Sequence, residues 1–147
     1  MKKLIMLGLI LVCLSSCTDE INTPPYIISV PVSKNTSNPP YYNHGGLEFS
    51  LSNKTTKPIT KIDISCFVYS SSDGKNPFSG SNRIRASFGE TIDSGETKKF
   101  AVSLDSRLCG IPPEPFIIDF LTVPKIVFSD GTIWTDPVCQ FFTRSSQ

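Results

Sequence analysis

The chain has 147 residues, and its 14 Lys and Arg nearly balance its 13 Asp and Glu. That balance argues against a nucleic-acid-binding protein, because displacing counterions from phosphates requires a basic face. Twelve Pro, ten Phe and very few Ala disfavour helices and are typical of short strands joined by turns.

The first sixteen residues have the order of a secretory signal. Lys2 and Lys3 precede an apolar run over residues 4–14, and Ser15 and Ser16 follow it. The run is shorter than the roughly 20 apolar residues that a transmembrane helix needs. We therefore expect residues 1–16 to form a signal helix that is cleaved off.

The residues Leu14-Ser15-Ser16-Cys17 lie directly after the apolar run. They resemble the lipobox of bacterial lipoproteins. The resemblance implies that the Cys17 thiol receives a diacylglycerol, that cleavage makes Cys17 the first residue, and that its new amino group is then acylated, for example with palmitate. At roughly 0.8 kcal/mol per buried methylene, two or three acyl chains would hold the protein on a membrane. The alternative is an ordinary signal in which Cys17 is incidental.

The residue after Cys17 bears on the location in the cell envelope. In enterobacterial lipoproteins an Asp there favours inner-membrane retention, and this chain has Thr18. The resemblance thus implies a lipid anchor in the outer membrane, on its periplasmic or surface face. The pair Asp19-Glu20 resembles surface-export signals of some lipoproteins, although two acids in a linker also serve solvation. We expect a signal peptide over 1–16, the lipidated Cys and a tether over 17–25, and one domain over 26–147.

Apolar and polar residues alternate with a period of two along much of this domain, as in half-buried strands. The pattern predicts seven strands, over residues 26–32, 47–52, 59–69, 83–88, 99–104, 116–128 and 133–136. Pro31 lacks a backbone donor and places the first strand at an edge. The third strand reads as central.

The pair Asp130-Gly131 predicts a two-residue hairpin turn between the last two strands. Counting outward from this turn places Phe128 opposite Ile133 and Lys125 opposite Asp136, which pairs apolar side chains and one pair of opposite charges.

Seven short strands predict an all-β fold, an antiparallel β sandwich, with a closed barrel as the alternative. Three turns support this class: Asn53-Lys54-Thr55, Gly95-Glu96-Thr97 and Asp130 to Trp134. They resemble the recurring turns of small extracytoplasmic immunoglobulin-like lipoprotein domains. The resemblance implies an immunoglobulin-like fold. Because these are turn and core residues, it implies no function.

The sequence offers little for catalysis, so we expect no enzyme and no cofactor. His44 is the only histidine, and its neighbours predict a mobile loop that would not hold a base near a nucleophile. The acids fall mostly in turns, which disfavours a carboxylate pair. Zinc at Cys66, Cys109, Cys139 and His44 is disfavoured because no two lie at ligand spacing. An envelope hydrolase is therefore the least favoured function.

Lipidation of Cys17 would leave three cysteines, which cannot all pair within one molecule. Cys66 belongs to the apolar face of the strand over 59–69 and reads as a small buried hydrophobe. Cys109 and Cys139 flank the final hairpin, so we expect a disulfide between them. Three free thiols or an intermolecular bridge are the alternatives.

Two stretches suit binding. The loop over 39–44 offers Tyr41, Tyr42 and His44, and near the C-terminus Phe141 and Phe142 must point in opposite directions along a strand, which exposes one of them. We therefore expect a lipid-anchored binding or structural protein of the bacterial envelope. Its partner would be an envelope, host or competitor protein or a glycan, and not a nucleic acid. The alternative is an inhibitor or immunity-type lipoprotein that blocks an enzyme.

Overall fold

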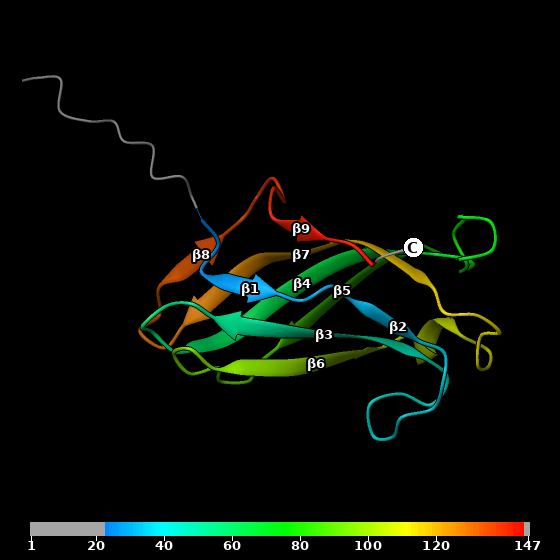
Figure 1. Cartoon of the computed structure of the whole chain (residues 1–147), viewed down its shortest axis with the longest axis horizontal. Coiled ribbons are helices and arrows are strands. Elements are labelled where there is room, and N and C mark those ends of the chain that lie inside the picture. Colours follow the sequence, from blue (N-terminus) through cyan, green and yellow to red (C-terminus); the bar gives the residue numbers. More distant parts are fainter. Residues whose placement is uncertain (1–22, 146–147) are drawn as a thin grey trace, which may run out of the picture.

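The computed structural model describes residues 23–145, and these fold into strands joined by turns (Figure 1). The predicted signal peptide, Cys17 and the tether residues up to 22 lie outside the described residues. Within them the elements are β1 (Tyr26–Ile28), β2 (Val32–Lys34), β3 (Gly46–Asn53), β4 (Ile59–Tyr69), β5 (Arg83–Phe88), β6 (Thr97–Ser103), a 3-10 turn η1 (Asp105–Arg107), β7 (Ile117–Phe128), β8 (Ile133–Thr135) and β9 (Phe142–Thr143).

The strands form two antiparallel sheets that pack face to face, so the predicted β sandwich is confirmed (Figure 1). In the first sheet β3 is central, with β6 along one edge and β1 and β2 sharing the other. The second sheet has the order β5, β4, β7, and its last edge is shared by β8 and β9. As predicted, the strand from 59 to 69 is central.

The core lies between the sheets and is built by alternation. On β4 the side chains of Ile62, Ile64, Cys66 and Val68 are all buried, while most of their neighbours reach the opposite face. Across from them, the rings of Phe49 and Phe100 stack at 5.4 Å. Burial raises the pKa of the Cys66 thiol to about 12, so it remains a neutral, inward-facing hydrophobe, as the sequence predicts.

Two differences in strand number have clear causes. The predicted strand over 26–32 is divided into β1 and β2, since Pro31 has no N–H to continue the ladder with β3. Both halves still occupy the edge, as expected. The additional strand β9 arises because the chain turns back after β8 and pairs with the middle of β7.

Strand β7 is irregular where it passes β4. Besides one shift of the register near Ile59, there are two irregular segments, between the pairs Asp63↔Lys125, Ser65↔Thr122 and Phe67↔Asp119. Pro124 lies in the first irregular segment, where no ladder donor is needed. In the second segment Phe120 has φ of 50°, a backbone region that bulky residues rarely adopt. These bulges change which β7 side chains face outward.

The predicted register of the last hairpin is wrong by one residue. Phe128 N–H donates to the Thr132 carbonyl at 2.9 Å, and Gly131 N–H donates to the Phe128 carbonyl at 2.9 Å. The loop therefore has three residues, and Ile126 rather than Val127 lies opposite Trp134. The cause is Gly131, whose φ of 82° adds a left-handed residue after the turn.

Replacing Gly131 by valine is expected to lower the free energy of unfolding by more than about 1 kcal/mol. No heavy atom lies within 4 Å of a Cβ built there, so the cost comes from the backbone alone. Urea unfolding followed by Trp134 fluorescence measures it, and Gly131→Asn is the control because Asn tolerates this conformation. Equal urea midpoints for the valine variant and the wild type would contradict the left-handed backbone conformation at Gly131.

The predicted disulfide between Cys109 and Cys139 is not formed, and among the described residues Cys66, Cys109 and Cys139 are free thiols. Cys109 is exposed in the loop that precedes β7. Cys139 instead lies beside Thr122 in the middle of β7, with its sulfur 3.9 Å from the Thr122 hydroxyl. The return of the chain toward β9 thus carries Cys139 away from the end of the strand where Cys109 lies.

Candidate binding surfaces

The loop between β2 and β3 projects from one end of the sandwich (Figure 1). Its tip closes on itself, because Asn38 N–H donates to the Tyr42 carbonyl at 2.9 Å and Tyr41 N–H donates to the Asn38 carbonyl at 2.9 Å. The Tyr41 side chain at the tip is 61% exposed. Tyr41 is therefore exposed and available for contact.

Tyr42 does not belong to this surface, contrary to the prediction. Its side chain is 2% exposed, and its hydroxyl donates to Glu48 Oε1 at 2.6 Å. Burial, followed by this contact, raises the pKa of the Tyr42 hydroxyl. The ring lies against Gly46, where a Cβ would come within 2.6 Å of it. Tyr42 anchors the loop to β3.

His44 lies in a segment whose backbone is fixed by Asp105. The Asp105 carboxylate accepts the Asn43 N–H at 2.7 Å and the His44 N–H at 2.8 Å. These hydrogen bonds, first the one from Asn43, lower the pKa of Asp105 to about 2. His44 itself is half-buried. The loop is held at two points, in place of the mobile segment expected from its composition.

We expect the hold of Asp105 on this loop to be lost in acid. A lowered folded-state pKa means that the stabilisation is complete above the unfolded value of about 3.9 and disappears as the pH falls toward 2. The amide shifts of Asn43 and His44 in NMR spectra should therefore titrate with a midpoint near 2, and Asp105→Asn should abolish the transition. A midpoint near 4 would contradict these hydrogen bonds.

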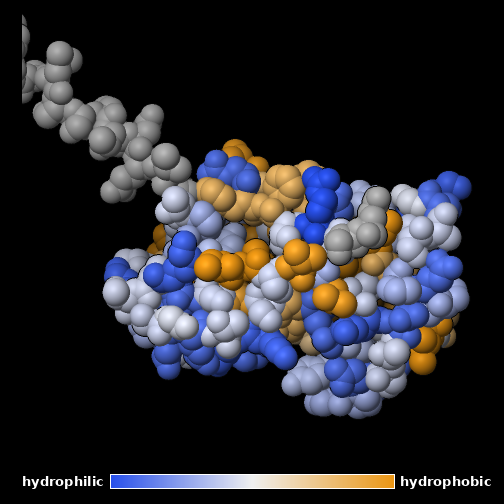
Figure 2. All heavy atoms as spheres, in the orientation of Figure 1, coloured by the Kyte–Doolittle hydropathy of each residue, from blue (hydrophilic) through white to orange (hydrophobic). Residues whose placement is uncertain are grey.

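A second surface forms where β9 lies along β7. The rings of Phe120 and Phe142 stack with centroids 4.4 Å apart and an interplanar angle of 23°. Their exposed fractions are 40% and 43%, so the pair is open to solvent. Figure 2 shows apolar surface along the upper rim of the molecule, where Figure 1 places β9. Of the two C-terminal phenylalanines, Phe142 is thus the exposed one.

Arg144 completes this surface. Its guanidinium carbon lies 5.6 Å from the centroid of Phe120 and 5.4 Å from that of Phe142, within the range of cation–π attraction. Its Nε lies 3.4 Å from Asp119 Oδ1. This contact leaves the two terminal amino groups of the guanidinium available to a ligand. We call Phe120, Phe142 and Arg144 the aromatic–arginine cluster.

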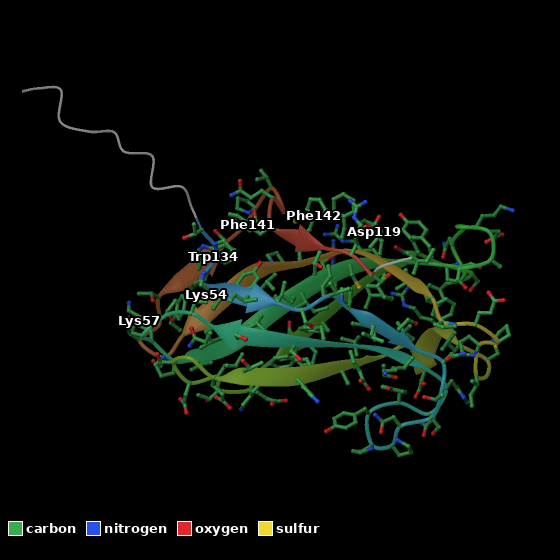
Figure 3. The ribbon with its side chains drawn as sticks, viewed as in Figure 1. Lys54, Lys57, Asp119, Trp134, Phe141 and Phe142 are labelled. Atoms are coloured by element: carbon green, nitrogen blue, oxygen red, sulfur yellow. The ribbon has the colours of Figure 1, made fainter. Side chains whose placement is uncertain are left out.

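The cluster is held in place from within the domain. The Asp136 carboxylate is buried and accepts the N–H groups of Gln140 at 3.1 Å and Phe141 at 3.0 Å, which turns the chain back toward β7. Phe141 then faces Trp134, with centroids 6.2 Å apart, and Phe142 faces outward (Figure 3). The two phenylalanines therefore point in opposite directions, as predicted.

The described residues 23–145 contain no group of three His, Cys, Asp or Glu side chains that could hold a metal ion. None of their helices has the length and hydropathy needed to cross a membrane. No family model, curated protein or solved structure matches the chain. The likeness to immunoglobulin-like domains therefore stays a prediction from the sequence.

Proposed function

We propose that this protein is a lipid-anchored component of the bacterial cell envelope that acts as a binding protein without catalysis. The anchor would be the acylated Cys17, and the contact surface would be the aromatic–arginine cluster. The observation that carries the proposal is the exposed Phe120–Phe142 stack with Arg144 over it.

The backbone at Phe120 supports a binding role for the cluster. A non-glycine residue at positive φ costs on the order of 1–3 kcal/mol and persists where the surrounding structure enforces it. Here the strained residue directs a phenyl ring to the surface, where 40% of the residue stays exposed instead of packing in the core. Phe and Arg are also among the residue types enriched at the centre of protein interfaces.

The proposed anchor suits a short tether. Eight residues, from Thr18 to Pro25, separate Cys17 from the first residue of β1. At about 3.3–3.6 Å per residue they would reach some 30 Å when fully extended. The domain would then remain close to the membrane surface, where its partners would be found.

Replacing Cys17 by serine tests the anchor. We expect the wild type to enter the detergent phase on Triton X-114 partitioning and the variant to remain in the aqueous phase and unprocessed at that site. Cys109→Ser is the control, since it removes an exposed thiol elsewhere. A Cys17→Ser protein of mature size in the detergent phase would overturn the lipid anchor.

A second candidate is an inhibitor or immunity-type lipoprotein, and the Tyr41 loop favours it. A protruding loop whose conformation is set before binding loses little entropy when it enters a cleft. Cross-linking in intact cells separates the two functions: Tyr41→Ala lowers partner recovery if the loop makes the contact, and Phe142→Ala does so if the cluster makes it. Ile133→Ala, which removes another exposed side chain, is the control for both.

A further inference from the structure

The outer face of the second sheet carries an excess of positive charge. Five cationic side chains lie on this face: Lys61, Arg83, Arg85, Lys125 and Arg144. Only two acidic side chains lie there, Asp63 and Asp119. The whole chain has 14 basic and 13 acidic residues. Positive charge is therefore concentrated on this face, which also includes the aromatic–arginine cluster.

The strand register places these side chains in rows across the sheet. Arg85 lies beside Ser65, which lies beside Thr122, and Thr122 is paired with Phe142. With neighbouring strands about 4.8 Å apart, this row from β5 to β9 spans roughly 14 Å. A path across the face thus runs from Arg85 at one end to the Phe120–Phe142 stack at the other, with Thr122 buried between them.

A shallow hollow of about 400 Å³ lies on this path between β4, β5 and the β7 bulge. Its lining includes Arg83, Arg85, Ser65, Ser87 and Pro124, together with Asp63. Arg83 Nε donates to the Ser65 hydroxyl at 2.9 Å, and its guanidinium carbon lies 5.8 Å from the centroid of Phe67. Both contacts orient this guanidinium before any ligand arrives.

The two acids on the face are already engaged. Asp63 Oδ1 accepts the Ser87 hydroxyl at 2.6 Å and lies 3.7 Å from Lys61 Nζ. Asp119 contacts Arg144 and also accepts the N–H of Phe120 at 2.9 Å. The two acids thus offset two of the five positive charges, so the face keeps a net charge of about plus three, and Arg85 is exposed beside the hollow.

We propose that this face binds an acidic polysaccharide. The carboxylates or sulfates of such a polymer would pair with Arg85 and Arg144, and the apolar C–H face of a sugar ring would lie on the Phe120–Phe142 stack. The proposal deepens the proposed function by naming the ligand class of the same surface.

The geometry favours an acidic polysaccharide over two other polyanions, double-stranded DNA and an acidic peptide. Double-stranded DNA carries one charge per roughly 1.7 Å of its axis, whereas cations on one face of a strand lie about 7 Å apart. That spacing suits a chain with one charge per sugar or per disaccharide. A peptide that adds to a sheet needs a free edge for its backbone hydrogen bonds, and a sheet face offers side chains instead.

The test titrates the full-length protein, purified in a non-ionic detergent, into fluorescein-labelled polymers and reads fluorescence anisotropy. Polygalacturonate supplies carboxylates, heparin supplies sulfates, and neutral dextran has no charge. Polyglutamate and single-stranded DNA represent the peptide and nucleic-acid alternatives. We expect binding to polygalacturonate or heparin, weakening as salt is raised, and none to dextran. Tighter binding of polygalacturonate would identify carboxylates as the preferred anionic groups, and tighter binding of heparin would identify sulfates.

Two double variants with the same change in net charge locate the site. Arg85→Ala with Arg144→Ala should weaken binding by roughly 10- to 100-fold, the loss expected for two charge-assisted contacts. Lys54→Ala with Lys99→Ala removes exposed cations outside this face and should change the dissociation constant by less than about threefold. Urea unfolding followed by Trp134 fluorescence verifies that both variants remain folded.

Several results would overturn the proposal. No binding to either acidic polysaccharide at physiological salt would do so, as would equal or tighter binding of polyglutamate or single-stranded DNA. Equal weakening by the two double variants would show that net charge, rather than this face, is responsible. Membrane anchoring is measured separately with Cys17→Ser, so failure of the polymer test leaves the anchor result standing.

Discussion

Gly46→Ala is expected to lower the free energy of unfolding by roughly 3 kcal/mol, the upper end of the cost of overpacking. A Cβ at this position would lie 2.7 Å from the Val102 carbonyl oxygen and 2.6 Å from the Tyr42 ring. The carbonyl belongs to the neighbouring strand β6, and the ring is buried and tied to Glu48. Neither neighbour has room to yield, so the first residue of β3 must shift.

Chemical unfolding in urea measures this loss, and Gly89→Ala is its control. No atom lies within 4 Å of a Cβ at Gly89, so that substitution should change stability by no more than about 0.5 kcal/mol. If both alanine variants unfold at the wild-type urea concentration, the close contact of Tyr42 with the β3 backbone is contradicted.

Asp136→Ala is expected to cost about 1–3 kcal/mol, because it leaves the partly buried N–H groups of Gln140 and Phe141 without their acceptor. The loss should also release β9, since the Asp136 carboxylate holds the turn that returns the chain to β7. We therefore expect trypsin to cleave faster after Arg144, in addition to a lower urea midpoint.

Asp136→Asn is the matched variant for this experiment. Its amide oxygen retains one acceptor in nearly the same place, so both stability and resistance to trypsin should fall by less than half as much. A urea midpoint that falls without faster cleavage after Arg144 would show that Asp136 stabilises the domain without positioning β9.

The alternation of apolar and polar residues was sufficient to predict most strands of the sandwich. Ile62, Ile64 and Val68 are inward-facing because β4 is a regular strand, and Pro31 marks an edge because it cannot donate. The hairpin register could not be derived in the same way. One left-handed residue at Gly131 changes the loop from two residues to three and shifts every pair beyond it.

The binding surface was harder to predict because it depends on tertiary contacts. Strict alternation would place Phe120 on the same side as the buried Ile118, and only the bulge in β7 directs it outward. Tyr42 was expected beside Tyr41 on the surface, yet the small Gly46 leaves space for its ring on β3. Neither the bulge nor this space has a signal in local composition.

The divided strands at the sheet edges also bear on crowding. Lipid anchors would hold many copies in one plane and one orientation, which favours pairing of exposed strands between neighbours and hence aggregation. Here β1 and β2 interrupt one edge at Pro31, and β8 and β9 cover another with two short segments. Lys98 and Lys99 lie on the edge strand β6. Short strands, proline and lysine are the devices that prevent edge-to-edge association, so this sandwich is suited to dense display on a membrane.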